Sequence, residues 1–63
     1  MRVNGVSRTG GPVSVRGLLD ELNLDGRGVA VARNGEIVPR STWESELLRE
    51  DDVIEIVTAA AGG

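Results

Sequence analysis

Few side chains in this sequence could carry covalent chemistry. Its 63 residues include no His, Cys, Tyr or Phe, and only one Trp and one Met. The usual nucleophiles, proton shuttles and soft metal ligands are therefore missing. Asp51 and Asp52 are adjacent carboxylates, but such a pair without further ligands indicates a turn rather than a metal site. The composition thus predicts that the chain is not an enzyme and binds no metal or cofactor of its own.

The end of the sequence is the remaining candidate for chemistry. Residues 58–63 hold no large side chain with which to dock, so we expect a flexible tail after a domain over residues 1–57. Gly62 and Gly63 lack a Cβ, which lets another protein approach their backbone and carbonyl groups from every side. The α-carboxylate of Gly63 is the candidate reactive group, although glycines at a chain end are also common in inert tails.

Size and charge limit the classes of partner. A chain of 63 residues allows one domain with one modest core. The net charge of −3, without basic clusters or interleaved aromatic residues, argues against nucleic-acid binding. No apolar run approaches the roughly 20 residues of a membrane span. Since cysteine and an apolar signal segment are both absent, we expect a cytoplasmic protein. We also expect the free protein to be a monomer.

Two Asn-Gly pairs predict hairpins, because both central positions of a type I′ turn require a positive φ. Asn4-Gly5 and Asn34-Gly35 each follow a short apolar run and precede another. The strands that they would join are residues 1–3 with 6–8, and residues 29–32 with 36–38. Pro39 would close the second hairpin, because it cannot donate to a strand ladder.

Helical spacing appears twice. Ser14 is a predicted N-cap for a helix of about three turns, whose apolar stripe is formed by Val15, Leu18, Leu19 and Leu22. Ser41 and Glu44 are spaced as a capping box, which predicts a second, short helix. Its apolar face would contain Trp43, Leu47 and Leu48. We expect Trp43 to be part of the core.

Residues 53–57 are the clearest strand, because β-branched residues dominate and the run is apolar enough to lie inside a sheet. The elements together predict an α+β roll with a mixed sheet of about five strands, one main helix and one short helix. If the last strand lies between the first strand and the strand after the main helix, it projects the C-terminus outward.

Several residues form a pattern more specific than any one of them. They are Val3-Asn4-Gly5, Val15, Leu18-Leu19, the run from Val31 to Arg40, Trp43, Asp52, Ile54-Glu55-Ile56 and Gly62-Gly63. With this pattern the whole chain resembles the ThiS family, sulfur carriers of thiamin biosynthesis with the ubiquitin-like β-grasp fold. One departure is Asp51, where the family usually has a glycine that supplies a positive φ.

The resemblance implies a function for the tail. An E1-like adenylyltransferase of the ThiF type would use ATP and Mg²⁺ to form the acyl-adenylate of Gly63. Sulfur would then replace the adenylate to give a thiocarboxylate, and a thiazole synthase of the ThiG type would use this sulfur. Ala60, Ala61 and Gly62 would occupy a narrow channel of the partner.

Two further residues are candidates for docking, each with a simpler interpretation beside it. Val57 could contact a partner or belong to the core. Arg40 could pair with a partner's carboxylate or be a solvated charge. Three other functions also stay open: a sulfur carrier for molybdopterin or cysteine synthesis, a ubiquitin-like protein modifier, and an interaction module with an inert tail.

Overall fold

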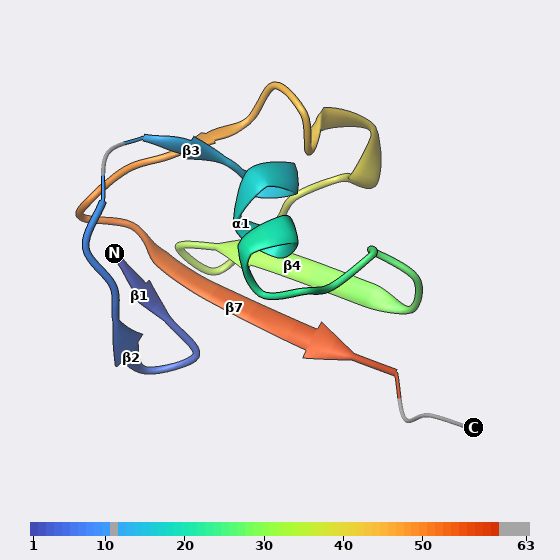
Figure 1. The fold of residues 1–63 in the computed structure, drawn as a ribbon, viewed down its shortest axis with the longest axis horizontal. Coiled ribbons are helices and arrows are strands. Elements are labelled where there is room, and N and C mark those ends of the chain that lie inside the picture. The colour runs from blue at the N-terminus through green and yellow to red at the C-terminus, as the bar shows by residue number, and fades with distance from the viewer. Residues whose placement is uncertain (11, 60–63) are drawn as a thin grey trace.

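The structure, a computed structural model, describes residues 1–10 and 12–59. A five-stranded mixed sheet forms its centre, and one α-helix lies across a face of that sheet (Figure 1). The elements in chain order are β1 (Arg2–Val3), β2 (Val6–Ser7), β3 (Val13–Ser14), α1 (Val15–Glu21), β4 (Val29–Arg33), β5 (Glu36–Ile37), the 3-10 helix η1 (Arg40–Thr42), β6 (Leu47–Leu48) and β7 (Val53–Thr58). No helix in this part of the chain is long and apolar enough to cross a membrane.

Strand β7 is the middle strand of the sheet, whose order is β2-β1-β7-β4-β5. It runs parallel to β1 and antiparallel to β4, as Figure 1 shows for β4 and β7 side by side. The β4 pairing runs from Val29 opposite Thr58 to Arg33 opposite Ile54. The predicted α+β roll with a mixed sheet is therefore confirmed, and so is the insertion of the last strand between the two others.

Both Asn-Gly pairs form the predicted turns. Asn4 has a φ of 51° and Gly5 a φ of 82°, while Asn34 and Gly35 have φ values of 51° and 85°. A positive φ at both central positions is the type I′ geometry, whose twist matches that of the flanking strands. The turns accordingly connect β1 to β2 and β4 to β5.

Helix α1 begins as predicted but is shorter. The Ser14 hydroxyl accepts a hydrogen bond from the Gly17 N–H at 2.9 Å, which caps the first turn. The helix has seven residues, about two turns rather than three. Asn23 takes a φ of 61°, a left-handed conformation that ends a helix.

The core lies between α1 and the sheet. Its buried apolar side chains come from both layers and from the segment before β7: Val3, Val15, Leu18, Leu19, Val29, Val31, Val38, Trp43, Leu48, Ile54 and Ile56. Trp43 is 2% exposed, and its Nε1–H donates to the Val38 carbonyl at 3.0 Å. Its predicted place in the core is confirmed.

The second predicted helix is wrong in its details. The structure has a 3-10 helix over Arg40–Thr42, without a side-chain cap, and then a strand at Leu47–Leu48 that pairs with β3. Leu48 is fully buried and Leu47 is 45% exposed, so these residues alternate across a strand rather than share a helical face. The carbonyls of Trp43 and Glu46 accept hydrogen bonds from the first N–H groups of α1, which an isolated helix leaves unpaired.

The end of β7 lies beyond the expected boundary at Val57. Thr58 is still a strand residue, and the Ala59 N–H donates to the Gly28 carbonyl at 2.7 Å. Two residues of the expected tail therefore remain attached to the folded body, because Thr58 lies opposite Val29 in the sheet and Ala59 hydrogen-bonds to Gly28. The other tail residues, 60–63, lie outside the residues that the structure describes.

Candidate functional site

The strand that leads to the C-terminus is held on one side by the first Asn-Gly turn. The Asn4 side chain makes two hydrogen bonds with one residue of β7: its Oδ1 accepts from the Ile56 N–H at 2.8 Å, and its Nδ2 donates to the Ile56 carbonyl at 3.1 Å. The Asn4 backbone N–H also donates to the Ile54 carbonyl at 2.9 Å. The side chain of Asn4 thus extends the pairing of β1 along β7 after β1 itself has ended at Val3.

The second Asn-Gly turn holds the start of the same strand. The Asn34 N–H donates to the Val53 carbonyl at 2.7 Å, and its side-chain Oδ1 accepts from the Val53 N–H at 2.9 Å. Its Nδ2 donates to Asp52 Oδ1 at 3.0 Å. Both left-handed asparagines, which the sequence identified only as turn residues, therefore also position β7.

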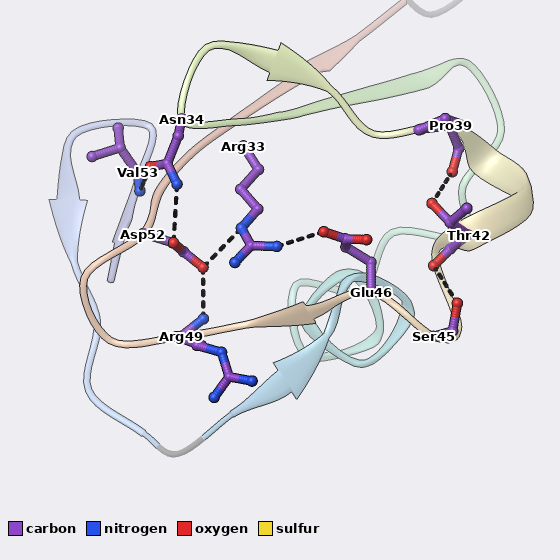
Figure 2. A network of polar contacts seen from close by, with 9 residues as sticks. All are labelled: Arg33, Asn34, Pro39, Thr42, Ser45, Glu46, Arg49, Asp52 and Val53. Atoms are coloured by element: carbon purple, nitrogen blue, oxygen red, sulfur yellow. Dashed lines mark hydrogen bonds and ion pairs between the residues drawn. The ribbon is translucent and has the colours of Figure 1, made fainter.

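A charged network lies beneath the second turn (Figure 2). Arg33 lies between two carboxylates: its Nη1 donates to Glu46, and its Nε lies 3.0 Å from Asp52 Oδ2. The Nε–H does not point at that oxygen, so the Asp52 contact is an ion pair rather than a hydrogen bond. Asp52 Oδ2 also accepts the Arg49 N–H at 2.8 Å. The network joins β4 to the two turns that flank β6.

These contacts keep Asp52 ionised although the residue is buried, with only 8% of its surface exposed. Burial raises the pKa of its carboxyl, but the hydrogen bonds from Arg49 and Asn34 and the charge of Arg33 outweigh this effect and hold the pKa below the ordinary 3.8. The hydrogen bond to Glu46, and the charges of Asp52 and Glu46, raise the pKa of Arg33 despite its own burial. The guanidinium of Arg33 thus lies between the carboxyl groups of Asp52 and Glu46.

The network fits a structural role better than a chemical one. Each of its carboxylates is engaged by Arg33, and it contains no nucleophile. In residues 1–10 and 12–59, no group of three His, Cys, Asp or Glu residues could hold a metal ion. Sequence reasoning placed Asp52 in a turn and missed its contacts, because Arg33 and Asn34 reach it only through tertiary packing. Asp51 is exposed and its φ is not positive, so the glycine expected there is not required.

The anchored end of β7, which we call the tail root, consists of Thr58 and Ala59. Thr58 pairs with Val29, and Ala59 bonds to Gly28, which has a φ of +63°. A Cβ on Gly28 would lie 3.1 Å from the Ala59 Cβ, so the two backbones approach closely. The predicted reactive and channel residues Ala60, Ala61, Gly62 and Gly63 lie outside the described residues.

Val57 lies on the sheet face away from α1. It is 66% exposed, whereas its neighbour Ile56 is buried, and its β4 partner is Ala30. Ile37 at the sheet edge is 71% exposed and is paired with Ala32, two residues after Ala30 on the same face. Val57 is therefore an exposed apolar residue directly before the tail root, and not a core residue.

Arg40 is not simply a solvated charge. Its Cζ lies 4.7 Å from the centroid of the Trp43 ring, a distance at which a guanidinium is attracted to an aromatic face. Arg16 in α1 also lies over this ring, at 5.3 Å. The structure thus places Val57 beside the tail root and Arg40 in a cluster with Trp43.

Comparison with known proteins supports the family. A profile described as the ThiS family matches residues 1–63. Sulfur carrier protein ThiS of Escherichia coli K12 is 36% identical over 50 residues, which cover 79% of this chain and 76% of that protein. A thiazole synthase of Paramagnetospirillum magneticum is 42% identical over 62 residues, which cover 97% of this chain but only 19% of that protein.

The fold leads to the same family. The crystal structure of a thiamine biosynthesis protein, ThiS, from Geobacter metallireducens superposes with a TM-score of 0.82 at 27% identity, over 98% of this chain and 96% of that chain. The resemblance inferred from the sequence is thereby confirmed. With its sheet order, its central β7 and a match over its whole length, this chain belongs to the ThiS family.

Proposed function

We propose that this chain is a sulfur carrier for thiamin biosynthesis and that the α-carboxylate of Gly63 carries the sulfur. An E1-like adenylyltransferase of the ThiF type activates the carboxylate, and a thiazole synthase of the ThiG type consumes the sulfur. ATP and Mg²⁺ are bound by the activating partner and not by this chain, which acts as a co-substrate in the cytoplasm. The membership of the ThiS family supports the carrier role, and the similarity to a thiazole synthase supports a ThiG-type partner.

One structural observation carries the proposal: the strand before the tail is anchored on both of its sides and by two asparagine side chains. β7 pairs with β1 and β4, and the side chains of Asn4 and Asn34 bond to its backbone. Four residues follow Ala59, and they can extend by at most about 14 Å at ~3.3 to 3.6 Å per residue. A fixed root followed by a short run of small residues suits delivery of one terminal group into a partner's site.

The chemistry requires activation, because a carboxylate is a poor electrophile at neutral pH. A Gly63 carboxylate oxygen attacks the α-phosphorus of ATP, so a P–O bond forms and pyrophosphate leaves. A sulfur nucleophile supplied by a partner then attacks the Gly63 carbonyl carbon, forms a C–S bond and expels AMP. Gly62 and Gly63 leave both faces of this carbonyl open to attack.

Docking is proposed for the sheet face away from α1. Val57 and Ile37 are exposed apolar residues on this face. Their strand partners Ala30 and Ala32 have small side chains that do not protrude from the sheet. Exposed apolar residues at the centre of a contact supply most of its affinity, whereas an extended tail loses entropy when it becomes ordered. The folded face therefore contributes binding, and the tail contributes placement.

Tail variants test the proposal. Deletion of Gly63, or Gly62→Val, should abolish thiocarboxylate formation when the chain is incubated with the ThiF-type partner, ATP and a sulfur source. Thermal unfolding should change little, because the described hydrogen bonds that anchor the tail root end at Ala59. A conservative Ala60→Gly variant, which keeps the length and the terminal glycines, should be loaded normally. Normal loading of the Gly63 deletion would rule the proposal out.

A further inference from the structure

Two arginines from distant parts of the chain converge on one aromatic ring. Arg16 is in α1 and Arg40 is in η1, and their Cζ atoms lie 5.3 Å and 4.7 Å from the centroid of the Trp43 ring. The ring is held by the hydrogen bond from its Nε1 to Val38, and Arg16 Nη1 donates to the Asp25 carbonyl at 3.3 Å. We call these three residues, Arg16, Arg40 and Trp43, the Arg–Trp cluster.

The charge of the cluster is not neutralised within the described part of the chain. All seven basic side chains of this acidic protein are arginines. Arg8, Arg27 and Arg33 form ion pairs with carboxylates of the same chain. Among residues 1–10 and 12–59, no carboxylate lies within 4.0 Å of the guanidinium nitrogens of Arg16 or Arg40. Two positive charges thus share one site on a chain whose net charge is −3.

The cluster is connected to the tail root by one short loop. A Cβ on Gly26 would lie 3.1 Å from Trp43 Cζ3 and 3.2 Å from Arg16 Nη1, so the backbone at Gly26 packs against the cluster. Two residues later, Gly28 packs against Ala59 and accepts its hydrogen bond. The loop that contains Gly26 and Gly28 therefore contacts the cluster at one residue and the tail root at the other.

We propose that the Arg–Trp cluster is a second docking site, and that it binds a carboxylate-bearing surface of the protein that activates the tail. Guanidinium groups present planar donors that match carboxylates, and stacking on Trp43 fixes their orientation before binding. The rest of the chain is acidic and repels an acidic partner surface, so this local attraction sets the orientation of the complex. The inference rests on the function proposed above and adds a recognition site to it.

The test measures binding and adenylation with the ThiF-type partner. The double variant Arg16→Gln with Arg40→Gln removes both charges from the cluster. Arg2→Gln with Arg49→Gln removes the same charge from two exposed positions outside the cluster and is the control for net charge. The dissociation constant is measured by calorimetry at low and high salt, and kcat and KM are measured for formation of the acyl-adenylate. Since Trp43 is the only tryptophan, 5-fluorotryptophan labelling gives a ¹⁹F signal from the cluster itself.

The cluster variant should bind about tenfold more weakly at low salt and show a smaller loss of affinity with added salt. Its KM should rise with kcat nearly unchanged, because an interaction that contributes only to binding of the partner stabilises the ground state and the transition state equally. The control should stay within about twofold of wild type. Saturation with the partner should shift the ¹⁹F signal of Trp43.

Wild-type affinity in a folded cluster variant, or an unmoved ¹⁹F signal at saturation, would overturn the inference and leave the proposed function intact. If the ¹⁹F signal shifts with ATP alone and not with the partner, the two arginines bind phosphate rather than a carboxylate surface of the partner. This result would also overturn the inference. If wild type is not adenylated at all, the proposed function and this inference fall together. Should the glutamine variant not fold, Arg16→Lys with Arg40→Lys keeps the charge, and about threefold weaker binding is then expected.

Discussion

The Asn4 side chain forms two hydrogen bonds with the backbone of Ile56, 52 residues away in the sequence. One amide group thus accepts from and donates to the same residue of β7, as a paired strand residue would. Asn4 can do this because its φ of 51° ends β1 and turns the side chain back along the sheet. A single turn residue therefore forms the hairpin and also helps to fix the strand that leads to the tail.

Substitution of Asn4 separates these two roles. Asn4→Gly keeps the left-handed turn but removes both side-chain hydrogen bonds, and we expect a loss of about 1–2 kcal/mol in the free energy of unfolding. Asn4→Ala removes the same bonds and leaves in the left-handed region a residue that tolerates it less well than asparagine or glycine, which should cost about 1 kcal/mol more. Denaturant unfolding of the two variants and wild type measures both effects. A glycine variant as stable as wild type would show that the bonds to Ile56 contribute nothing.

The lowered pKa of Asp52 predicts that the free energy of unfolding falls in acid. Its pKa in the folded chain is lower than the ordinary 3.8, so the unfolded chain binds the proton first as the pH falls. The stability from Asp52 is complete above the unfolded value and is lost as the pH falls through the folded value. Asp52→Asn should lower the free energy of unfolding at pH 7 by about 1–3 kcal/mol and flatten its dependence on pH below about pH 4.

The exposed neighbour Asp51 is the matched control for this experiment. Asp51→Asn should change stability by less than about 0.5 kcal/mol and keep the acid dependence of wild type. Urea unfolding between pH 2.5 and pH 7 compares the three proteins. Equal acid dependence in wild type and Asp52→Asn would contradict the role assigned to the network with Arg33.

Substitution of Gly28 by alanine should disturb Ala59 as well as strain the backbone at position 28. Gly28→Ala and Gly35→Ala both place a Cβ at a positive φ, which should cost about 1 kcal/mol each in stability. Only the new Cβ at position 28 would contact Ala59, at 3.1 Å, since nothing lies within 4 Å at position 35. Amide chemical shifts should therefore move at Thr58 and Ala59 in the first variant alone. Unchanged shifts there would show that Gly28 does not position the tail root.

Val57 and Val6 test the proposed docking face. Both valines are exposed to similar extents, 66% and 64%, but Val57 lies next to the tail root and Val6 lies on the edge strand β2. Val57→Ser should weaken binding to the ThiF-type partner about fivefold or more, and Val6→Ser should leave it unchanged. Calorimetric titration gives both affinities. The docking role of Val57 would be rejected by equal affinities of the two variants.

The sequence was sufficient where one local signal determined the structure. Asn4-Gly5 and Asn34-Gly35 admit few conformations other than a type I′ turn, and the β-branched run of β7 marked a buried strand. The apolar stripe and Ser14 identified α1 in the same way. Once these elements are in place, one helix must cover one face of the sheet, and the fold class follows.

Local signals did not distinguish the alternatives around β6. Leu47 follows Trp43 by four residues, which fits a helical face, but a two-residue strand is too short to show any periodicity. The outcome was decided by tertiary contacts. The carbonyls of Trp43 and Glu46 accept hydrogen bonds from the first N–H groups of α1, and Leu48 is buried in a strand that pairs with β3.

The polar contacts of the site were likewise beyond the reach of the sequence. Asp52 lies 18 residues from Asn34, and only the packing of the sheet brings the two side chains together. Arg16 and Arg40 meet over Trp43 for the same reason. The glycine tail, in contrast, was predicted as the reactive end from composition alone, and this stays a prediction because residues 60–63 lie outside the described part of the chain.

The central claim is that Gly63 is activated through its α-carboxylate, and mass spectrometry tests it most directly. The chain is incubated with ATP, Mg²⁺ and a ThiF-type partner, and its intact mass and C-terminal fragments are then measured. The account predicts a mass increase equal to AMP less water, located on Gly63 and replaced by a sulfur-for-oxygen exchange when a sulfur source is added. An unchanged chain, or a modification on any residue other than Gly63, would contradict it.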